Sequence, residues 1–95
     1  MRLIGINRIL EFIKKHPNSS SGLRRWQKII ESSEFKNFSE LRKTFPHADQ
    51  VEGKTVFNVG GNKVRTITII EYGISQMLIL DVLTHPEYDR GKWKS

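Results

Sequence analysis

Several side chains in the second half of the chain could act together on a phosphate group. Arg65, His85 and Tyr88 provide a permanent cation, an imidazole and a phenol. An arginine guanidinium binds two phosphate oxygens as a fork, and a histidine can take up or release a proton near neutral pH. Lys54 and Lys63 would add positive charge. These residue types predict a site that binds a backbone phosphate and stabilises extra charge on it.

The same side chains also fit a less specific interpretation. Asp81 could simply pair with Arg65 on a solvated sheet face, and Tyr88 and Trp93 could anchor the C-terminal tail. The three histidines are too scattered to indicate a zinc site, and no His-Glu-x-x-His pattern, carboxylate cluster or cysteine occurs. We therefore expect no metal site and no cofactor.

The composition favours one small basic domain. The 95 residues contain 16 Lys and Arg against 10 Asp and Glu, a formal net charge of +6, which favours a polyanionic partner. A chain of this length forms a single domain, 1–95, with no room for a deep cofactor cavity. The absence of cysteine excludes disulfides and fits the cytoplasm, and the short apolar runs predict no membrane-spanning helix.

The hydrophobic period changes from helical to alternating along the chain. The first half predicts a strand over 3–6, a helix over 7–15, a second helix through Leu23, Trp26, Ile29 and Ile30 that begins after Ser20 or Ser21, and a helix over 39–45. The second half predicts strands over 55–59, 63–72 and 77–83, followed by a polar tail over 85–95. Helices followed by hairpin-linked strands indicate an α+β fold with an antiparallel sheet.

The two expected hairpins determine which side chains share a face. A two-residue turn at the double glycine pairs Val59 with Asn62, and the next turn pairs Tyr72 with Gln76. Arg65 then lies opposite Leu83, and one face carries most of the polar and charged residues of these strands. The residues on this face are Lys54, Val56, Asn58, Lys63, Arg65, Ile67, Asp81, Leu83 and His85. The other face, which would receive the helices, carries Thr55, Phe57, Val64, Thr66, Thr68, Leu78, Leu80 and Val82.

Two motifs make a family resemblance specific. The segment 56–65 reads Val-Phe-Asn-Val-Gly-Gly-Asn-Lys-Val-Arg, and 84–89 reads Thr-His-Pro-Glu-Tyr-Asp. With the upstream helical hairpin and the Leu-Arg-Lys-x-Phe-Pro segment, this order and spacing resembles the HigB family of type II toxins, within the RelE-like group. The resemblance covers essentially the whole chain. One departure is Val64, where an aromatic residue is common.

The resemblance implies a RelE-like fold, in which an N-terminal helical hairpin packs on a twisted, mainly antiparallel sheet. It also implies an endoribonuclease, an mRNA interferase, that cuts messages on the ribosome and inhibits translation and growth. The implied partner is a HigA-like helix-turn-helix antitoxin, through which the toxin would meet DNA only indirectly. The implied location is the cytoplasm.

We expect catalysis from Arg65, His85, Tyr88 and Lys63, and RNA binding by Lys54, Asn58, Asn62 and Arg90. RNA supplies its own nucleophile, the 2′-OH, so no metal is required. Arg65 would bind the phosphate, His85 would transfer a proton, and Tyr88 would stack on a base or transfer a second proton. Pro86 suits the first turn of a short helix that brings His85 and Tyr88 to one face. The alternatives are a non-catalytic RNA- or ribosome-binding module, and an inactive toxin that serves only as antitoxin partner and corepressor.

Overall fold

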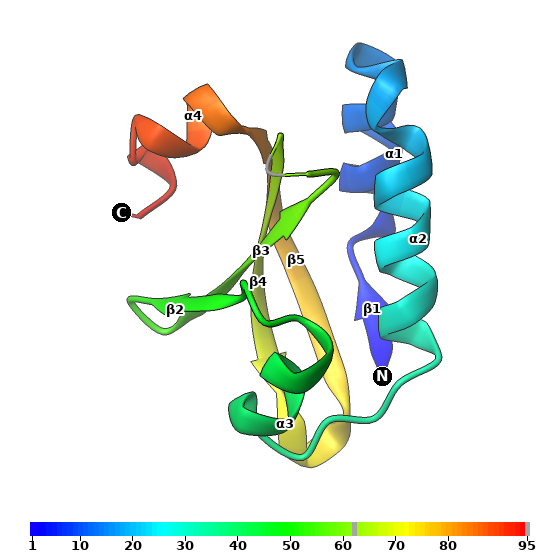
Figure 1. The fold of residues 1–95 in the computed structure, drawn as a ribbon, viewed down its shortest axis with the longest axis vertical. Helices are drawn as coiled ribbons and strands as arrows, with labels where there is room; N and C mark the ends of the chain where they lie inside the picture. The colour runs from blue at the N-terminus through cyan, green and yellow to red at the C-terminus, as the bar shows by residue number, and fades with distance from the viewer. Residues whose placement is uncertain (62, 95) are drawn as a thin grey trace.

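A five-stranded mixed sheet divides the molecule into two faces (Figure 1). The computed structural model describes residues 1–61 and 63–94. The strands run in the order β1-β5-β4-β3-β2, with β1 parallel to β5 and the other pairs antiparallel. Their bounds are β1 Arg2–Ile4, β2 Asp49–Val51, β3 Lys54–Val59, β4 Val64–Glu71 and β5 Gln76–Thr84.

The helices cover the two faces unequally. The helices are α1 Ile6–Lys15, α2 Ser20–Glu31, α3 Phe38–Thr44 and α4 His85–Asp89, with short 3₁₀ turns at Pro17–Ser19, Tyr72–Ile74 and Lys92–Lys94. Figure 1 shows α1 and α2 on one side of the sheet, and α4 with the C-terminal end of the chain on the other. The α+β fold class predicted from the hydrophobic period is confirmed. No helix in the described residues is long and apolar enough to cross a lipid bilayer.

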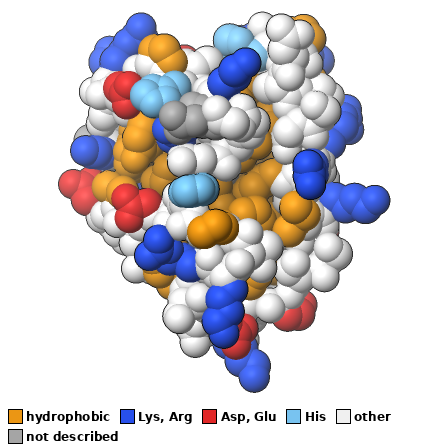
Figure 2. All heavy atoms as spheres, in the orientation of Figure 1, with side chains coloured by type: hydrophobic (Ala, Val, Ile, Leu, Met, Phe, Trp, Pro, Cys, Tyr) orange, Lys and Arg blue, Asp and Glu red, His pale blue; other side chains and the backbone are white. Residues whose placement is uncertain are grey.

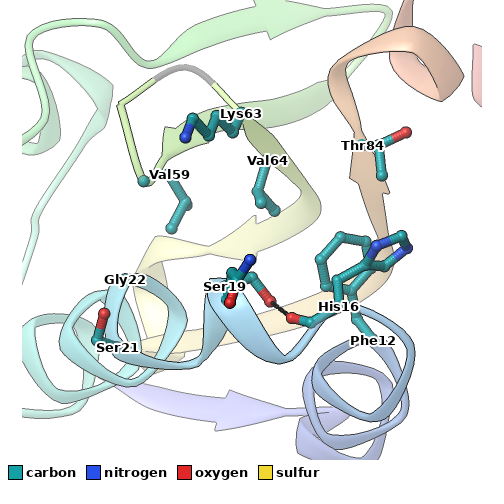
Figure 3. Close-up of a pocket in the computed structure, with 11 residues that line it drawn as sticks. Phe12, His16, Ser19, Ser21, Gly22, Val59, Lys63, Val64 and Thr84 are labelled. Carbon is teal, nitrogen blue, oxygen red and sulfur yellow. Dashed lines mark hydrogen bonds between the residues drawn. The ribbon is translucent and has the colours of Figure 1, made fainter.

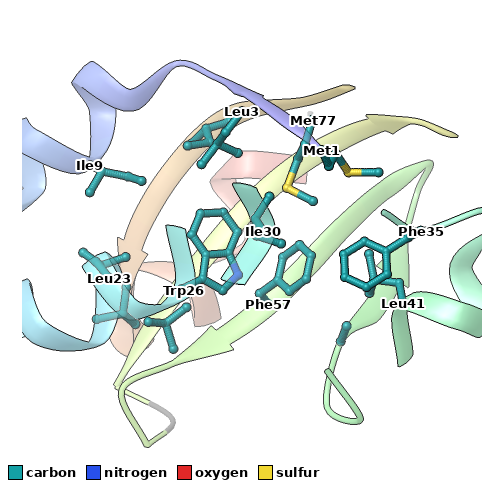
Figure 4. Close-up of a cluster of buried hydrophobic side chains, with 14 of the residues drawn as sticks. Met1, Leu3, Ile9, Leu23, Trp26, Ile30, Phe35, Leu41, Phe57 and Met77 are labelled. Atoms are coloured by element: carbon teal, nitrogen blue, oxygen red, sulfur yellow. The ribbon is translucent and has the colours of Figure 1, made fainter. Parts of the chain in front are cut away.

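The main core lies between the helical hairpin and the sheet (Figure 4). Helical spacing places Leu23, Trp26 and Ile30 on the buried face of α2. The Trp26 indole meets the Phe57 ring of β3 edge to face, with the two centroids 5.3 Å apart. This packing holds β3 and β4 against the helices and leaves the opposite face of these strands for the C-terminal segment.

A second, smaller cluster lies on that opposite face. Val56 of β3 and Ile67 of β4 pair directly in the sheet, and Trp93 from the C-terminal segment packs with them. Leu80 and Leu83 of β5 are partly buried against the same cluster. The charged face expected from the sequence is therefore covered in part by an apolar contact with the chain's own C-terminal end.

The first hairpin differs from its expected register by two residues. Val59 pairs with Val64 and not with Asn62, so the turn spans four residues. Because the side-chain period of a strand is two, a shift of two residues leaves the faces of β3 unchanged. Asn58 now lies directly opposite Arg65.

The second hairpin contains two deviations that cancel. Glu71 and not Tyr72 pairs with Gln76, a slip of one residue at the turn. A β-bulge then leaves Leu80 without a direct partner, because Thr68 pairs with Ile79 while Ile67 pairs with Asp81. Beyond the bulge the predicted pairing of Arg65 with Leu83 is confirmed.

The bulge also corrects part of the predicted inner face. Met77 and Ile79 face the main core, whereas Leu78 is 40% exposed and Leu80 packs with the cluster around Trp93. The predicted placement of Leu78 and Leu80 toward the helices was wrong, because one extra residue reverses the alternation of β5.

The sequence reasoning also missed smaller elements. The β2 strand was not expected, and the residue at the N-terminal boundary of α2 is Ser19, without a side-chain cap, where we had expected Ser20 or Ser21. The first strand is shorter than expected, Arg2–Ile4, because Gly5 adopts a left-handed conformation at the start of α1.

Candidate active site

Arg65 is held in the middle of the sheet, near the end of β4 that meets α4. It lies between Asn58 on β3 and Leu83 on β5, and only 6% of it is exposed. Buried arginines are rare and must keep favourable contacts for their charge. The structure therefore fixes this guanidinium within the fold, where sequence reasoning had expected an open cation.

The Tyr88 ring contacts both Arg65 and Trp93. The carbon Cζ of Arg65 is 5.2 Å from the Tyr88 ring centroid, a cation–π contact. The Trp93 ring stacks on Tyr88 at 4.9 Å between centroids and 15° between planes, and its Nε1–H donates to the Tyr88 carbonyl at 2.9 Å. Burial raises the pKa of Tyr88, although the Arg65 charge opposes this, so the phenol is protonated at neutral pH.

The helix α4 has a strong N-terminal cap that orients these side chains. The Thr84 hydroxyl accepts from the Glu87 backbone N–H, and the Glu87 carboxylate accepts from the Thr84 backbone N–H at 2.9 Å. This second bond is the main reason that the pKa of Glu87 is lowered, with partial burial opposing it. Pro86 lies in the first turn, as predicted.

His85 is the first residue of α4 and is held at two points. Its backbone N–H donates to the Lys63 carbonyl at 3.0 Å, which ties α4 to the turn between β3 and β4. Its Nδ1 lies 2.9 Å from Oδ2 of Asp89, one helical turn further on. The His85 side chain is 40% exposed, so it points to solvent and not into the core. Sequence reasoning had found His85 and Tyr88 but not the contact with Asp89.

Lys63 lies at a different surface from the one expected. It lines a pocket of about 390 Å³ between the helical hairpin and the β3–β4 turn (Figure 3). Phe12, Val59 and Val64 form apolar walls of this pocket, and His16 lies at its edge. The other residues that line this pocket place it on the helix side of the sheet, away from the face that carries Val56 and Ile67. The contribution of Lys63 to the site is the carbonyl that holds His85.

The expected RNA-binding residues are spread over the site region. Asn58 is exposed and lies opposite Arg65. Arg90 is exposed at the end of α4, where it lines a pocket together with Trp93. Lys54 lies four residues from Asn58 along β3, a distance of roughly 13 Å at about 3.3 Å per residue. Asn62 lies outside the described residues. Figure 2 likewise shows cations distributed over one side of the molecule and not gathered in one patch.

Two features that sequence reasoning missed carried a signal. Thr84 and Glu87 have the spacing of a capping box, and His85 and Asp89 have the i, i+4 spacing of a helical pair. The expectation that Tyr88 and Trp93 could anchor the C-terminal tail is confirmed, since both pack with Val56 and Ile67 of the sheet; the stacking of the two rings on each other carried no local signal. Among residues 1–61 and 63–94, no group of three His, Cys, Asp or Glu side chains could hold a metal ion.

Comparison with known proteins gives a consistent result. The HigB toxin family model, described as the RelE-like toxic component of a toxin–antitoxin system, matches residues 19–91. The mRNA interferase HigB of Escherichia coli O6:H1 (strain CFT073) is 29% identical over 83 residues, which cover 84% of this chain and 81% of that protein. The mRNA interferase toxin HigB of Escherichia coli K12 is 30% identical over 92 residues, covering 94% and 88%. The mRNA interferase HigB of Shigella flexneri matches with the same figures.

Proposed function

This chain belongs to the HigB family of RelE-like toxins, and on that premise we propose how it cleaves RNA. It is the toxic component of a toxin–antitoxin system, and we assign it the mRNA interferase activity for which its relatives are named. The observation that carries the mechanism is α4, which brings a histidine and a tyrosine to the end of the sheet where Arg65 lies.

Cleavage by attack of the 2′-OH has three requirements. One group must take the 2′-OH proton, another must stabilise the crowded phosphate, and a third must protonate the departing 5′ oxygen. Arg65 is suited to the phosphate, because a guanidinium stays charged and binds two oxygens together. His85 is suited to one proton transfer, since its ring is partly exposed beside the site. Tyr88 offers a protonated phenol for the other.

The burial of Arg65 adds a condition to this mechanism. With 6% of the residue exposed and Tyr88 over its guanidinium, a phosphate reaches it only if the Tyr88 ring moves aside. The helix α4 has five residues, and the segment after it is held chiefly through Trp93. We infer that RNA binding displaces this C-terminal segment.

The other expected residues take smaller roles in the proposal. Asn58 can contact RNA beside Arg65, and Arg90 can bind phosphate at the rim. Lys63 acts through the carbonyl that holds His85, with its side chain in the neighbouring pocket. Lys54 is suited to RNA further along the strand, and Asn62 remains a proposed contact.

The family implies an antitoxin partner. We propose that it is a HigA-like helix-turn-helix protein, so that contact with DNA is indirect. We also propose that the substrate is a message on the ribosome, which places the activity in the cytoplasm. Exposed cations on the helical hairpin favour contact with ribosomal RNA; they are Arg8, Lys14, Lys15, Arg24, Arg25 and Lys28.

The burial of Arg65 also favours a second candidate, an inactive toxin that acts only as antitoxin partner and corepressor. Induced expression without antitoxin separates the two, because an interferase arrests growth and an inactive toxin does not. The mechanism is tested on ribosomes carrying a message with a 2′-deoxy codon in the A site. Loss of cleavage there, with 2′,3′-cyclic phosphate and 5′-OH ends on the all-ribose message, supports 2′-OH attack. Equal cleavage of both messages would refute it.

A further inference from the structure

We propose that Asp89 is the positioning residue of His85 and determines which imidazole nitrogen exchanges protons with RNA. The inference rests on the proposed function, in which His85 is a proton-transfer group. It gives a role to Asp89, the last residue of the motif at 84–89.

The geometry decides the tautomer. Oδ2 of Asp89 lies 2.9 Å from Nδ1 of His85. An unprotonated Nδ1 would direct its lone pair at a negatively charged oxygen 2.9 Å away, so the Asp89 carboxylate favours the neutral tautomer that carries the proton on Nδ1. The remaining nitrogen, Nε2, is then the atom that accepts a proton from substrate or returns one to it.

The main chain of His85 is fixed independently of its ring. The Lys63 carbonyl accepts from its backbone N–H, and the reciprocal bonds of Thr84 and Glu87 hold the turn in which it lies. Asp89 supplies the remaining constraint, on the rotation of the ring. A histidine held at both its backbone and Nδ1 presents Nε2 in one direction, which proton transfer requires.

Helix stability does not explain this pair. A carboxylate in the last turn of a helix meets the negative end of the helix dipole, and an acid that follows a base at i, i+4 has the less favourable order. The side chains are 40% and 60% exposed, where an ion pair contributes little to folding. The placement of Asp89 is therefore better explained by the orientation of His85 than by the stability of α4.

The proton transfer itself runs through Nε2 in either direction. When His85 is the base, the 2′-OH proton moves to Nε2, the oxygen attacks phosphorus, and the bond to the 5′ oxygen breaks as that oxygen takes a proton from a second acid such as the Tyr88 phenol. When His85 is the acid, it starts protonated and its Nε2 proton moves to the departing 5′ oxygen, while the 2′-OH proton passes to a second base, such as a water molecule or a phosphate oxygen. Asp89 exchanges no proton with RNA in either case.

The test compares cleavage of ribosome-bound message by wild-type protein, Asp89→Ala, Asp89→Glu and His85→Ala, and by the double variant of His85→Ala with Asp89→Ala. Glu71→Gln, at the far end of β4, is the control for the added positive charge of Asp89→Ala. We expect Asp89→Ala to slow cleavage by about tenfold or more, but by no more than the 10²–10⁴-fold loss expected when the whole acid–base group is removed. Asp89→Glu should recover part of the rate. The double variant should be no slower than His85→Ala alone, because Asp89 acts through His85.

A spectroscopic readout separates positioning from a structural effect. In ¹⁵N-labelled protein, the His85 ring signals are assigned by their loss in His85→Ala, and neutral His85 should carry its proton on Nδ1. Asp89→Ala should lose that preference while antitoxin binding and circular dichroism stay unchanged. An unchanged tautomer, a rate equal to that of Glu71→Gln, or additive losses in the double variant would overturn the inference while leaving His85 in place. Full activity of His85→Ala would instead refute the catalytic role that the proposed function gives to His85, and the inference with it.

Discussion

The Arg65 guanidinium lies over the ring of Tyr88, with Cζ 5.2 Å from the ring centroid. The same ring is stacked on Trp93. The contact joins a residue from the centre of the sheet to one on the helix that follows the last strand. It therefore couples the proposed phosphate-binding group to the position of α4 and of the C-terminal segment.

Tyr88→Phe tests what the phenol contributes. The ring makes the contacts with Arg65 and Trp93, and the hydroxyl is the group that can transfer a proton to RNA. Phenylalanine keeps both ring contacts and removes the hydroxyl. We expect cleavage of ribosome-bound message to fall by about 10²-fold or more, with ribosome affinity unchanged. Near-normal cleavage would show that the ring and not its hydroxyl matters.

Trp93 should support both stability and the site. Trp93→Ala removes an indole that is 9% exposed and packs on Val56 and Ile67, which should lower the free energy of unfolding by about 3 kcal/mol. Trp93→Phe keeps a stacked ring but loses the bond to the Tyr88 carbonyl, a loss of about 1 kcal/mol. Urea denaturation of wild type, Trp93→Phe and Trp93→Ala measures their stabilities, which should decrease in that order. A midpoint for Trp93→Ala equal to wild type would show that the C-terminal segment is not packed on the sheet.

The pairing of Arg65 with Leu83 shows how far the sequence could predict the sheet. Alternation and turn residues identified the strands, but the turn lengths were wrong at both hairpins. The second error was cancelled by a bulge at Leu80, which no local pattern marks, because a bulge depends on how β5 packs between its two neighbours. The predicted pairing was therefore correct near Arg65, whereas the predicted facing of Leu78, on the other side of the bulge, was wrong.

The site residues divide in a similar way. Arg65, His85 and Tyr88 were predicted from residue type and motif spacing, and in the structure they lie toward the same end of the sheet. The burial of Arg65 could not be predicted, because it depends on where α4 places the Tyr88 ring relative to the sheet. The side chain of Lys63 was misplaced because it lies in a turn, where the alternation of a strand no longer applies.

The cap of α4 should make part of the stability depend on pH. The pKa of Glu87 is below its ordinary value of 4.5, chiefly because its carboxylate accepts from the Thr84 backbone. A lowered carboxylate pKa stabilises the fold above the ordinary value, and this contribution is lost as the pH falls through the folded value. We expect Glu87→Gln to lower the urea midpoint at pH 7 and to differ little from wild type at pH 3. Glu71→Gln, which changes the charge by the same amount, is the control. If Glu87→Gln lowers the urea midpoint equally at both pH values, the ionised cap does not explain the loss of stability.

Cleavage should not depend on an added metal ion. RNA supplies the 2′-OH, and the described residues contain no cluster of His, Asp and Glu that could bind a metal. On ribosome-bound message with the magnesium concentration held constant, we expect a chelator selective for zinc and manganese to leave the rate unchanged within about twofold. Loss of cleavage that Mn²⁺ or Zn²⁺ restores would contradict this mechanism. Magnesium is held constant because the ribosome itself requires it.

The central claim is that Arg65 stabilises the phosphate during mRNA cleavage, and mapping of mRNA 5′ ends in cells tests it most directly. Arg65→Lys keeps the charge and most of the volume but loses the guanidinium fork. Wild-type protein induced without antitoxin should produce new 5′ ends inside codons. Arg65→Lys, at equal expression and with unchanged antitoxin binding, should produce few or none. The same pattern and number of ends from Arg65→Lys would contradict the account.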